Sequence, residues 1–444
     1  MGRSQPKYSS RANRSWNRRL KILMNSRHSS DDVLKPTTLG LPWNFPFYRP
    51  LNGPHPLVES FIRNNPSINT VNLRPDFAIK SEHFRGVVPT LCDQARLISE
   101  QQTADYVNWI GLVEQITIDA QSGQCSALFH HTTPLHIGST PWIFHFESFP
   151  SLFMPFIFSG ATGGIALKRQ GYFELVRRVL CSEDCRLIFT HMKSSRDIFE
   201  RVFDSAELTA KLHYIPLGIE SQTSARALGK FDHSGPIRVL FTNSLHQNPD
   251  SFFLRGGHHL LRAFSKLREE HIDVELTIIS SVPDDLAAYF SNSDLTGVTW
   301  IPERVEDPVL EDLLLSHHVF ALPAAGLHSY SLVRALAHGC VPIVSDALGY
   351  DEYTQSIQDS VFVMRGAREM VYRQEPEGWI SDSYASFAKP SREFSSQIYQ
   401  FLLDNRDRSK LRQMAERNLE YCRTRHDLGQ SQQEFCKRVS QFVA

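Results

Sequence analysis

Long apolar runs are missing from this sequence: no stretch reaches the about 18 consecutive apolar residues that a membrane-spanning helix needs. The densest candidate, residues 142–158, is interrupted by His145, Glu147 and two prolines. The amino terminus carries charge but lacks the apolar segment of a secretory signal peptide. We therefore expect a cytoplasmic protein without a transmembrane helix.

An excess of one charge is missing as well, because the formal net charge is -1. Composition therefore gives no reason to expect binding to nucleic acid. The seven cysteines are scattered, and the close pair Cys181 and Cys185 lacks the second pair that a zinc site would have. The first predicted strand, residues 20–24, is not followed by a glycine-rich loop, so NAD binding has no support. We expect reduced cysteines and no bound cofactor.

Differences in composition divide the 444 residues, which are enough for two α/β domains. The first 20 residues are basic and contain no acidic residue, which is typical of a disordered tail. This tail either contacts anionic lipid or is simply solvated. We predict five segments: a basic tail over 1–20, a first Rossmann-like domain over 21–222, a linker over 223–235, a second Rossmann-like domain over 236–390 and C-terminal helices over 391–444.

Residues 319–346 have the pattern of a strand, a loop, a helix, a turn and a second strand. The continuous apolar run 319–322 is typical of a strand that is buried on both faces of a parallel sheet. Ser329 or Ser331 is a suitable cap for the helix, and Gly339 is suited to end it. A helix N-terminus at the carboxyl ends of parallel strands favours anions. This unit therefore predicts a site for a ligand that carries phosphate.

The sequence P-x5-S-x-S-L-x-R-A-L-A-H-G-C-V-P-I-V-S-D, followed by G-Y-D-E, resembles the nucleotide-sugar site of GT-B glycosyltransferases. It is most similar to the glycogen-synthase-like group (family 4 type, glycosyl transferases group 1), and partly resembles exostosin-type transferases. Residues 211–220 also resemble the I-P-N-G-V-D segment that ends the first domain of related enzymes. Gly326 and Arg334 depart from the pattern, because they stand where the group has two spaced glutamates.

The resemblance implies a GT-B fold, in which two Rossmann-like parallel-sheet domains face each other across a cleft and the C-terminal helices cross back. It also implies that Arg255, followed by two glycines, neutralises the diphosphate of the donor, a role that suits the start of a helix. Asn243 and Ser244 stand where related enzymes often have a second basic residue. The implied donor-binding residues are Arg255, Gly256, Gly257, Arg304, Ser329, Tyr330, Ser331, Arg334 and Glu352.

Two polar clusters follow predicted strands of the first domain, at residues 130–136 and 145–148. Similar transferases place a cleft-facing histidine after the strand that begins at Pro141. Counting from Pro141 puts Glu147 at that position and His145 two residues earlier, so both are candidates to orient or deprotonate the acceptor. A metal held by the histidines and Glu147 is an alternative, although GT-B enzymes usually need no metal.

The resemblance implies a hexosyltransferase-type reaction that moves a sugar from a nucleoside diphosphate donor to a hydroxyl acceptor, in glycan or glycoconjugate biosynthesis. The acceptor is then a glycan, a lipid-linked sugar or a small molecule, and contact with a membrane surface is an option. One alternative is a non-catalytic sugar-nucleotide binder or scaffold, which the missing glutamates favour. Another is an epimerase of the same fold, which needs no acceptor.

Overall fold

The computed structural model describes residues 37–42, 56–73, 125–132, 134, 136, 140–153, 160–243, 251–291, 293–303 and 305–443, which all belong to one compact unit. The basic tail, the predicted strand at 20–24, Ser244 and Arg304 lie outside the described residues. No helix within the described ranges combines the length and the apolar character that crossing a bilayer requires.

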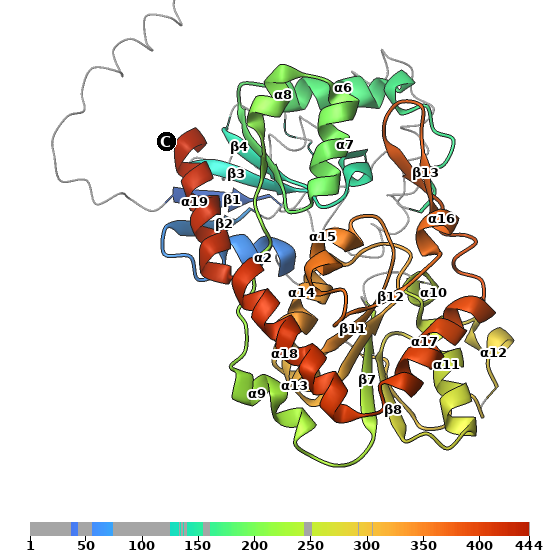
Figure 1. The fold of residues 1–444 in the computed structure, drawn as a ribbon. Coiled ribbons are helices and arrows are strands. Elements are labelled where there is room, and N and C mark those ends of the chain that lie inside the picture. Colours follow the sequence, from blue (N-terminus) through green and yellow to red (C-terminus); the bar gives the residue numbers. More distant parts are fainter. Residues whose placement is uncertain are drawn as a thin grey trace, which may run out of the picture. The chain divides into compact units, whose positions relative to one another are not determined.

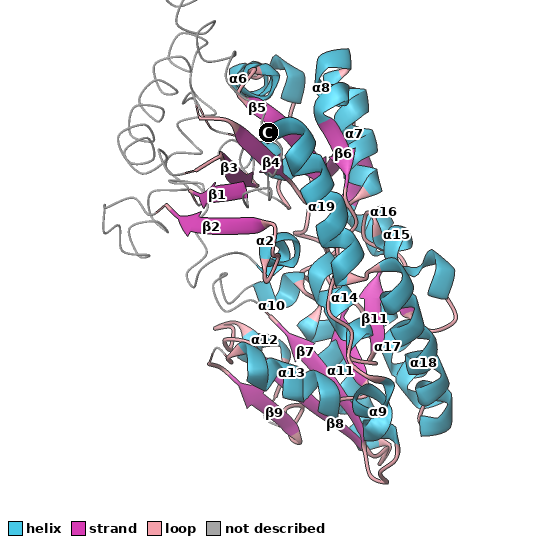
Figure 2. Ribbon diagram, turned by 90° about the vertical axis from the view of Figure 1, so that its left-hand side faces the viewer, coloured by secondary structure: helices cyan, strands magenta, loops and turns pink. Residues whose placement is uncertain are grey.

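The first sheet contains six parallel strands in the order β2-β1-β3-β4-β5-β6 (Figure 2). Every residue of β3 and β4 is buried, as expected for central strands of a sheet with both faces covered. The strands are β1 (Thr37–Leu41), β2 (Ile68–Asn72), β3 (Ala127–His131), β4 (Trp142–His145), β5 (Cys185–Thr190) and β6 (Leu212–Tyr214). The associated helices are α2 (Pro56–Ile62), η2 (Phe149–Phe153), η3 (Leu167–Arg169), α6 (Gly171–Cys181), α7 (Lys193–Phe203) and α8 (Ala206–Lys211).

The second sheet contains six parallel strands in the order β12-β11-β10-β7-β8-β9. Figure 1 shows α14 and α18 on one face of this sheet and α11 and α17 on the other. The strands are β7 (Ile237–Thr242), β8 (Val274–Ile279), β9 (Val298–Ile301), β10 (Val319–Leu322), β11 (Val341–Ser345) and β12 (Phe362–Met364). A separate antiparallel pair is formed by β13 (Tyr372–Gln374) and β14 (Ile380–Asp382).

Helices precede, connect and follow the strands of the second sheet. They are α9 (Ser224–Leu228), η4 (Gly229–Phe231), α10 (Ser251–Leu254), α11 (Gly257–Glu269), α12 (Leu286–Tyr289), α13 (Asp307–Ser316), α14 (Ser329–Ala337), α15 (Tyr350–Thr354), η5 (Gln355–Ile357) and α16 (Ala367–Val371). The unit predicted at residues 319–346 is confirmed as β10, α14 and β11. Gly339 follows α14 with φ of 65°, a backbone conformation that favours glycine after a helix.

The last three helices are α17 (Arg392–Asp404), α18 (Arg408–Arg425) and α19 (Leu428–Val443). The first two pack against helices of the second sheet, α11 and α14 respectively, whereas α19 lies beside α2 and β5 of the first sheet (Figure 1). Phe435 of α19 places its ring 5.7 Å from Phe61, 5.8 Å from Phe129 and 5.5 Å from Phe189. The predicted fold of two parallel sheets with a C-terminal helix that crosses back is confirmed.

Buried histidines are a feature of the second sheet. His258 and His259 lie on α11, and His317 and His318 precede β10. Burial lowers the pKa of His258, His317 and His318 to about 4 and that of His259 to about 2. These side chains are therefore neutral in the folded protein at pH values where the unfolded chain already takes up protons.

We expect the protein to lose stability as the pH falls below 6.5, the ordinary pKa of histidine. Because the pKa values of these histidines are lower in the folded than in the unfolded protein, the free energy of unfolding has its full value above pH 6.5. It decreases as the pH falls toward about 4, since the unfolded chain takes up protons first. Each such histidine lowers the free energy of unfolding by ~1.4 kcal/mol per pH unit. Urea denaturation at pH 7.5, 6.5 and 5.5 measures the slope.

The variant His259→Phe serves as the control for this prediction. His259 packs edge-on against Phe387 and Phe394, so phenylalanine keeps an aromatic ring there but removes one titrating group. Its stability is expected to fall less steeply with pH, by about one bound proton. Equal stability of the wild-type protein at pH 7.5 and 5.5 would contradict the explanation.

Candidate active site

Side chains that follow two strands of the first sheet, β4 and β5, meet the start of α14. Ser329, the first residue of α14, donates a hydrogen bond from its Oγ to Glu147 Oε1 at 2.5 Å. The Nε2 atom of His191, which follows β5, lies 2.9 Å from the same Oγ. Glu147 follows β4, so the two sheets contribute to one cluster. This is the edge at which ligands bind to parallel α/β sheets.

The cap predicted for α14 is wrong. The N-cap residue is His328, and no side chain caps the helix. Ser329 instead is fully buried and gives its hydroxyl proton to Glu147. Its oxygen, the atom with which a capping serine accepts from the helix, lies 2.9 Å from His191 Nε2, so the side chain is engaged with the first sheet rather than with its own helix.

The geometry separates the two candidate residues after β4. His145 is completely buried between two other imidazoles, with its Nδ1 atom 2.8 Å from His131 Nδ1 and its Nε2 atom 3.0 Å from His191 Nδ1. The side chain of Glu147 keeps 30% of its surface exposed. Glu147 is therefore the one of the two that solvent, and hence a ligand, reaches in this structure.

These histidines bond to one another and to Ser329. Within the described residues, no group of three or more histidine, cysteine, aspartate or glutamate side chains is arranged to hold a metal ion. His130 and His136 form a separate ring contact near Trp142, and burial lowers the pKa of His130 well below its ordinary value.

Arg255 lies between α10 and α11 and is 8% exposed. Burial lowers its pKa to about 10, and the negative charge of Glu147 acts in the opposite direction. The guanidinium is therefore still charged at neutral pH and lies within electrostatic range of the Glu147 carboxylate. The structure thus brings together two predicted site residues: the cation Arg255 from the second domain and the carboxylate Glu147 from the first.

The two glycines after Arg255 have a packing role. Gly256 has φ of 78°, and a Cβ atom there would collide with the carbonyl oxygen of Pro323, the residue after β10. A Cβ atom on Gly257 would collide with the ring of Phe252. Gly256 therefore lets the start of α11 press against the loop that leads to α14, and Gly257 lets it press against α10. Arg255 directly precedes these two contacts.

A small pocket lies at the carboxyl ends of β10 and β11, and Gly326 contributes to its wall. A Cβ atom on Gly326 would lie 2.9 Å from the hydroxyl oxygen of Tyr384. The backbone N–H of Tyr384 donates to Gly160 O at 3.0 Å. A side chain larger than glycine at position 326 would therefore meet the far end of the Tyr384 side chain.

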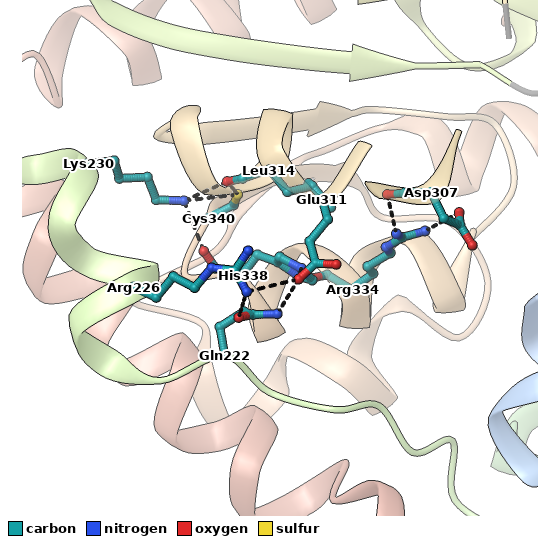
Figure 3. Close-up of polar contacts among 9 residues, drawn as sticks. All are labelled: Gln222, Arg226, Lys230, Asp307, Glu311, Leu314, Arg334, His338 and Cys340. Atoms are coloured by element: carbon teal, nitrogen blue, oxygen red, sulfur yellow. Dashed lines mark hydrogen bonds and ion pairs between the residues drawn. The ribbon is translucent and has the colours of Figure 1, made fainter. Parts of the chain in front are cut away.

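Arg334, at the position of the second family glutamate, is engaged by α13. Its Nη1 atom lies 3.3 Å from Asp307 Oδ1, and its side chain is 14% exposed. Figure 3 shows the guanidinium reaching toward Asp307, next to a cluster in which Glu311 contacts Gln222 and His338. In this structure Arg334 therefore fixes α14 to α13.

Glu352 connects the second sheet to the first. Its carboxylate accepts hydrogen bonds from the backbone N–H groups of Lys193, at 2.5 Å, and Ser194, at 2.7 Å. These groups are at the start of α7, whose N-cap residue, Met192, provides no side-chain cap. Glu352 therefore caps a helix of the first domain, in favourable interaction with the helix dipole.

The remaining predicted residues lie near the cluster or outside the described part. Tyr330 and Ser331 are half-buried in the first turn of α14. His191 and Tyr384 were not predicted. His191 follows the end of a buried strand, as Glu147 does, so the same reasoning from strand ends applies to it. Tyr384 follows β14 and has no comparable signal in the sequence.

Comparisons with known proteins find one family that matches the second sheet. Residues 238–373 match the family described as glycosyl transferases group 1. A search of curated proteins finds no match. The prediction of a group 1 transferase is confirmed for this part of the chain, whereas the partial exostosin likeness receives no support.

Solved structures share the fold. α,α-Trehalose 6-phosphate synthase from Burkholderia multivorans superimposes with a TM-score of 0.53 at 12% identity, over 84% of this chain and 85% of that one. Sucrose-phosphate synthase from Thermosynechococcus elongatus gives a TM-score of 0.54 at 11% identity, over 91% of this chain and 87% of that one. HepE from Anabaena, in complex with UDP, gives a TM-score of 0.51 at 10% identity, over 91% of this chain and 100% of that one. The predicted GT-B fold is confirmed.

Proposed function

We propose, on the premise that residues 238–373 are a group 1 glycosyl transferase domain within a GT-B fold, that this protein transfers a sugar from a nucleoside diphosphate donor to a hydroxyl acceptor. The observation that carries the proposal is the convergence of Arg255, the start of α14 and Glu147 at one edge of the two sheets. A cation and a helix N-terminus on one side, and a carboxylate on the other, suit the two charges that this reaction generates.

The donor side of the site is assigned to the second domain. As the bond between the sugar and the diphosphate breaks, negative charge develops on the leaving oxygen. The Arg255 guanidinium and the backbone N–H groups at the start of α14, residues 329–331, provide fixed positive potential for that charge. The UDP bound to HepE, a protein of the same fold, supports a nucleotide as the ligand.

The other donor-binding residues form an outer group in this proposal. Gly256 and Gly257 position Arg255, and Tyr330 lies beside the phosphate-binding turn. Arg334 and Glu352 are assigned to the donor from the resemblance, and in this structure they contact α13 and the start of α7. Arg304 is assigned to the nucleotide base from the resemblance alone.

The acceptor side is assigned to Glu147. In this proposal its carboxylate takes the proton of the acceptor hydroxyl while the acceptor oxygen forms the new bond to the sugar carbon. The electrons of the broken bond remain on the diphosphate. Because His145 is enclosed by two imidazoles, its role is to support Glu147 rather than to touch the acceptor. The reaction requires no redox or group-carrying cofactor.

The proposed acceptor is a glycan, a lipid-linked sugar or a small molecule. The proposed location is the cytoplasm, either free or in contact with a membrane surface.

A non-catalytic nucleotide-sugar binder is the second candidate function. It is favoured by the contact of Tyr384 with the position of the first family glutamate, Gly326, and by the pairing of Arg334 with Asp307.

Purified protein distinguishes these functions. UDP-, GDP- and ADP-glucose are first compared by thermal shift, since a ligand present at 100 times its Kd stabilises by ~2.7 kcal/mol. The stabilising donor is then incubated with and without mixed glycan acceptors, and release of nucleoside diphosphate is measured. Acceptor-dependent release supports transfer. Stabilisation without any release supports the binder, and the absence of both results refutes the nucleotide-sugar site.

A further inference from the structure

Three buried imidazoles form a continuous hydrogen-bonded row that ends at the candidate base. The row runs from His131 through His145 and His191 to Ser329 and Glu147, with successive distances of 2.8, 3.0, 2.9 and 2.5 Å. The three histidines come from the ends of β3, β4 and β5, which are neighbours in the first sheet. In the proposed function Glu147 is the one residue of this row whose side chain touches the acceptor, and the hydrogen bonds between the three imidazoles have no assigned role.

The row has one consistent direction when Glu147 is ionised and the imidazoles are neutral. A carboxylate only accepts, so Ser329 gives its single proton to Glu147. The Ser329 oxygen must then accept from His191 Nε2, which leaves His191 Nδ1 as an acceptor. The same argument makes His145 Nε2 a donor to His191, and His131 Nδ1 a donor to His145. All four donated protons point toward Glu147.

The surroundings keep the row in place. His145 contacts the rings of Phe61 and Phe189, and the hydroxyl of Tyr353 donates to the backbone oxygen of His191 at 2.9 Å. Among the described residues, the titratable groups that act on the row from other elements include Tyr353, His426 and Arg255. Burial lowers the pKa of His426 to about 4 and raises the pKa of Tyr353 well above its ordinary value, so both are neutral near pH 7.

We propose that His131, His145 and His191 are positioning residues for the transfer reaction: their fixed tautomers force the Ser329 hydroxyl to donate to Glu147. One carboxylate oxygen is thereby held, and the carboxylate stays oriented for the acceptor proton. If His131 supplies no N–H, the tautomers of the row are free to reverse, and Ser329 then turns its proton to His191 Nε2. The expected effect on kcat rests on the proposed function, whereas the expected tautomers do not.

The tautomers are tested without any substrate. In protein with 15N-labelled histidine at pH 7.5, imidazole NMR spectra are expected to show the proton on Nδ1 for His131 and on Nε2 for both His145 and His191. Assignment uses single His→Gln variants. Protons on the opposite nitrogens, or rapid exchange between the two forms, would overturn the inference even if transfer activity is present.

The kinetic test uses a matched pair at His131, two imidazoles away from Ser329. Asparagine places an N–H close to the position of Nδ1, whereas leucine has no donor. His131→Leu is expected to lower kcat about tenfold, with an unchanged KM for the donor, while His131→Asn keeps most of the activity. The pH profile of kcat is expected to change in the leucine variant alone.

The two failures are distinguishable. If the wild-type protein turns over no donor but shows the expected tautomers, the proposed function fails and the ordered row stands. If turnover is normal and both His131 variants behave alike after correction for thermal stability, the row has only a structural role and the inference fails.

Discussion

The variant Arg255→Ala is expected to lower kcat/KM for the nucleotide sugar by about 100- to 1000-fold, the loss seen when one fixed donor to a developing oxyanion is removed. Arg255 is buried, positively charged at neutral pH and directly followed by the two glycines that let α11 press against its neighbours. Water that fills the space of the missing guanidinium carries no net charge, so it does not replace the positive charge of Arg255. Initial rates over a range of donor concentrations measure the effect.

Arg262→Ala is the matched control, because Arg262 lies on the exposed face of the same helix, α11. It is expected to retain wild-type rates. Arg255→Lys is expected to be intermediate, since lysine keeps the charge but not the forked geometry that binds a diphosphate at two points. If Arg255→Ala binds and turns over the donor as well as the wild-type protein does, the assignment of the diphosphate to this site is wrong.

The second large effect is expected for Glu147→Gln, with kcat reduced by about 10²–10⁴-fold, the range typical of a general base. Glutamine retains a carbonyl oxygen that accepts the hydrogen bond from Ser329, so the contact between the sheets survives. It cannot accept the acceptor's proton. Donor binding, measured by thermal shift, is therefore expected to stay close to that of the wild-type protein.

Glu183→Gln, on the exposed surface of the same domain, controls for a general effect of removing one carboxylate. A Glu147→Gln variant with full transfer activity would show that the acceptor proton leaves by another route. A variant that loses donor binding together with activity would instead place Glu147 on the donor side of the reaction.

Local signals explain why the start of α14 could be predicted from the sequence. An apolar strand, a turn-rich loop, a helix with one apolar face and a terminal Gly339 follow one another within 28 residues, so each boundary has a neighbouring signal. The pairing of Arg255 with this unit was also accessible, because the family resemblance supplied it. In both cases the information lies in the order of residues along the chain.

The choice between His145 and Glu147 could not be made from the sequence. Strand β4 is buried on both faces, so it lacks the alternation of polar and apolar residues that would show which side chains point outward. The capping residue of α7 could not be predicted for a related reason. Glu352 caps α7 from a position 159 residues away from Lys193, and a search for capping residues examines only the neighbouring residues.

The departures from the family pattern show the same limit. Gly326 and Arg334 are visible in the sequence as unexpected residues, but their neighbours in the structure, Tyr384 and Asp307, belong to other elements. A single sequence therefore shows that the two glutamates are missing, but not which contacts these positions make instead.

The position of Phe435 has a consequence for synthesis on the ribosome. Its ring fills the space between Phe61, Phe129 and Phe189, so the first domain lacks part of its interior until α19 has emerged. At translation rates of about 5–20 residues per second, Phe189 waits roughly 10 to 50 s for this partner. During that interval a nascent first domain exposes aromatic surface, and chaperones that recognise such surface have time to bind it.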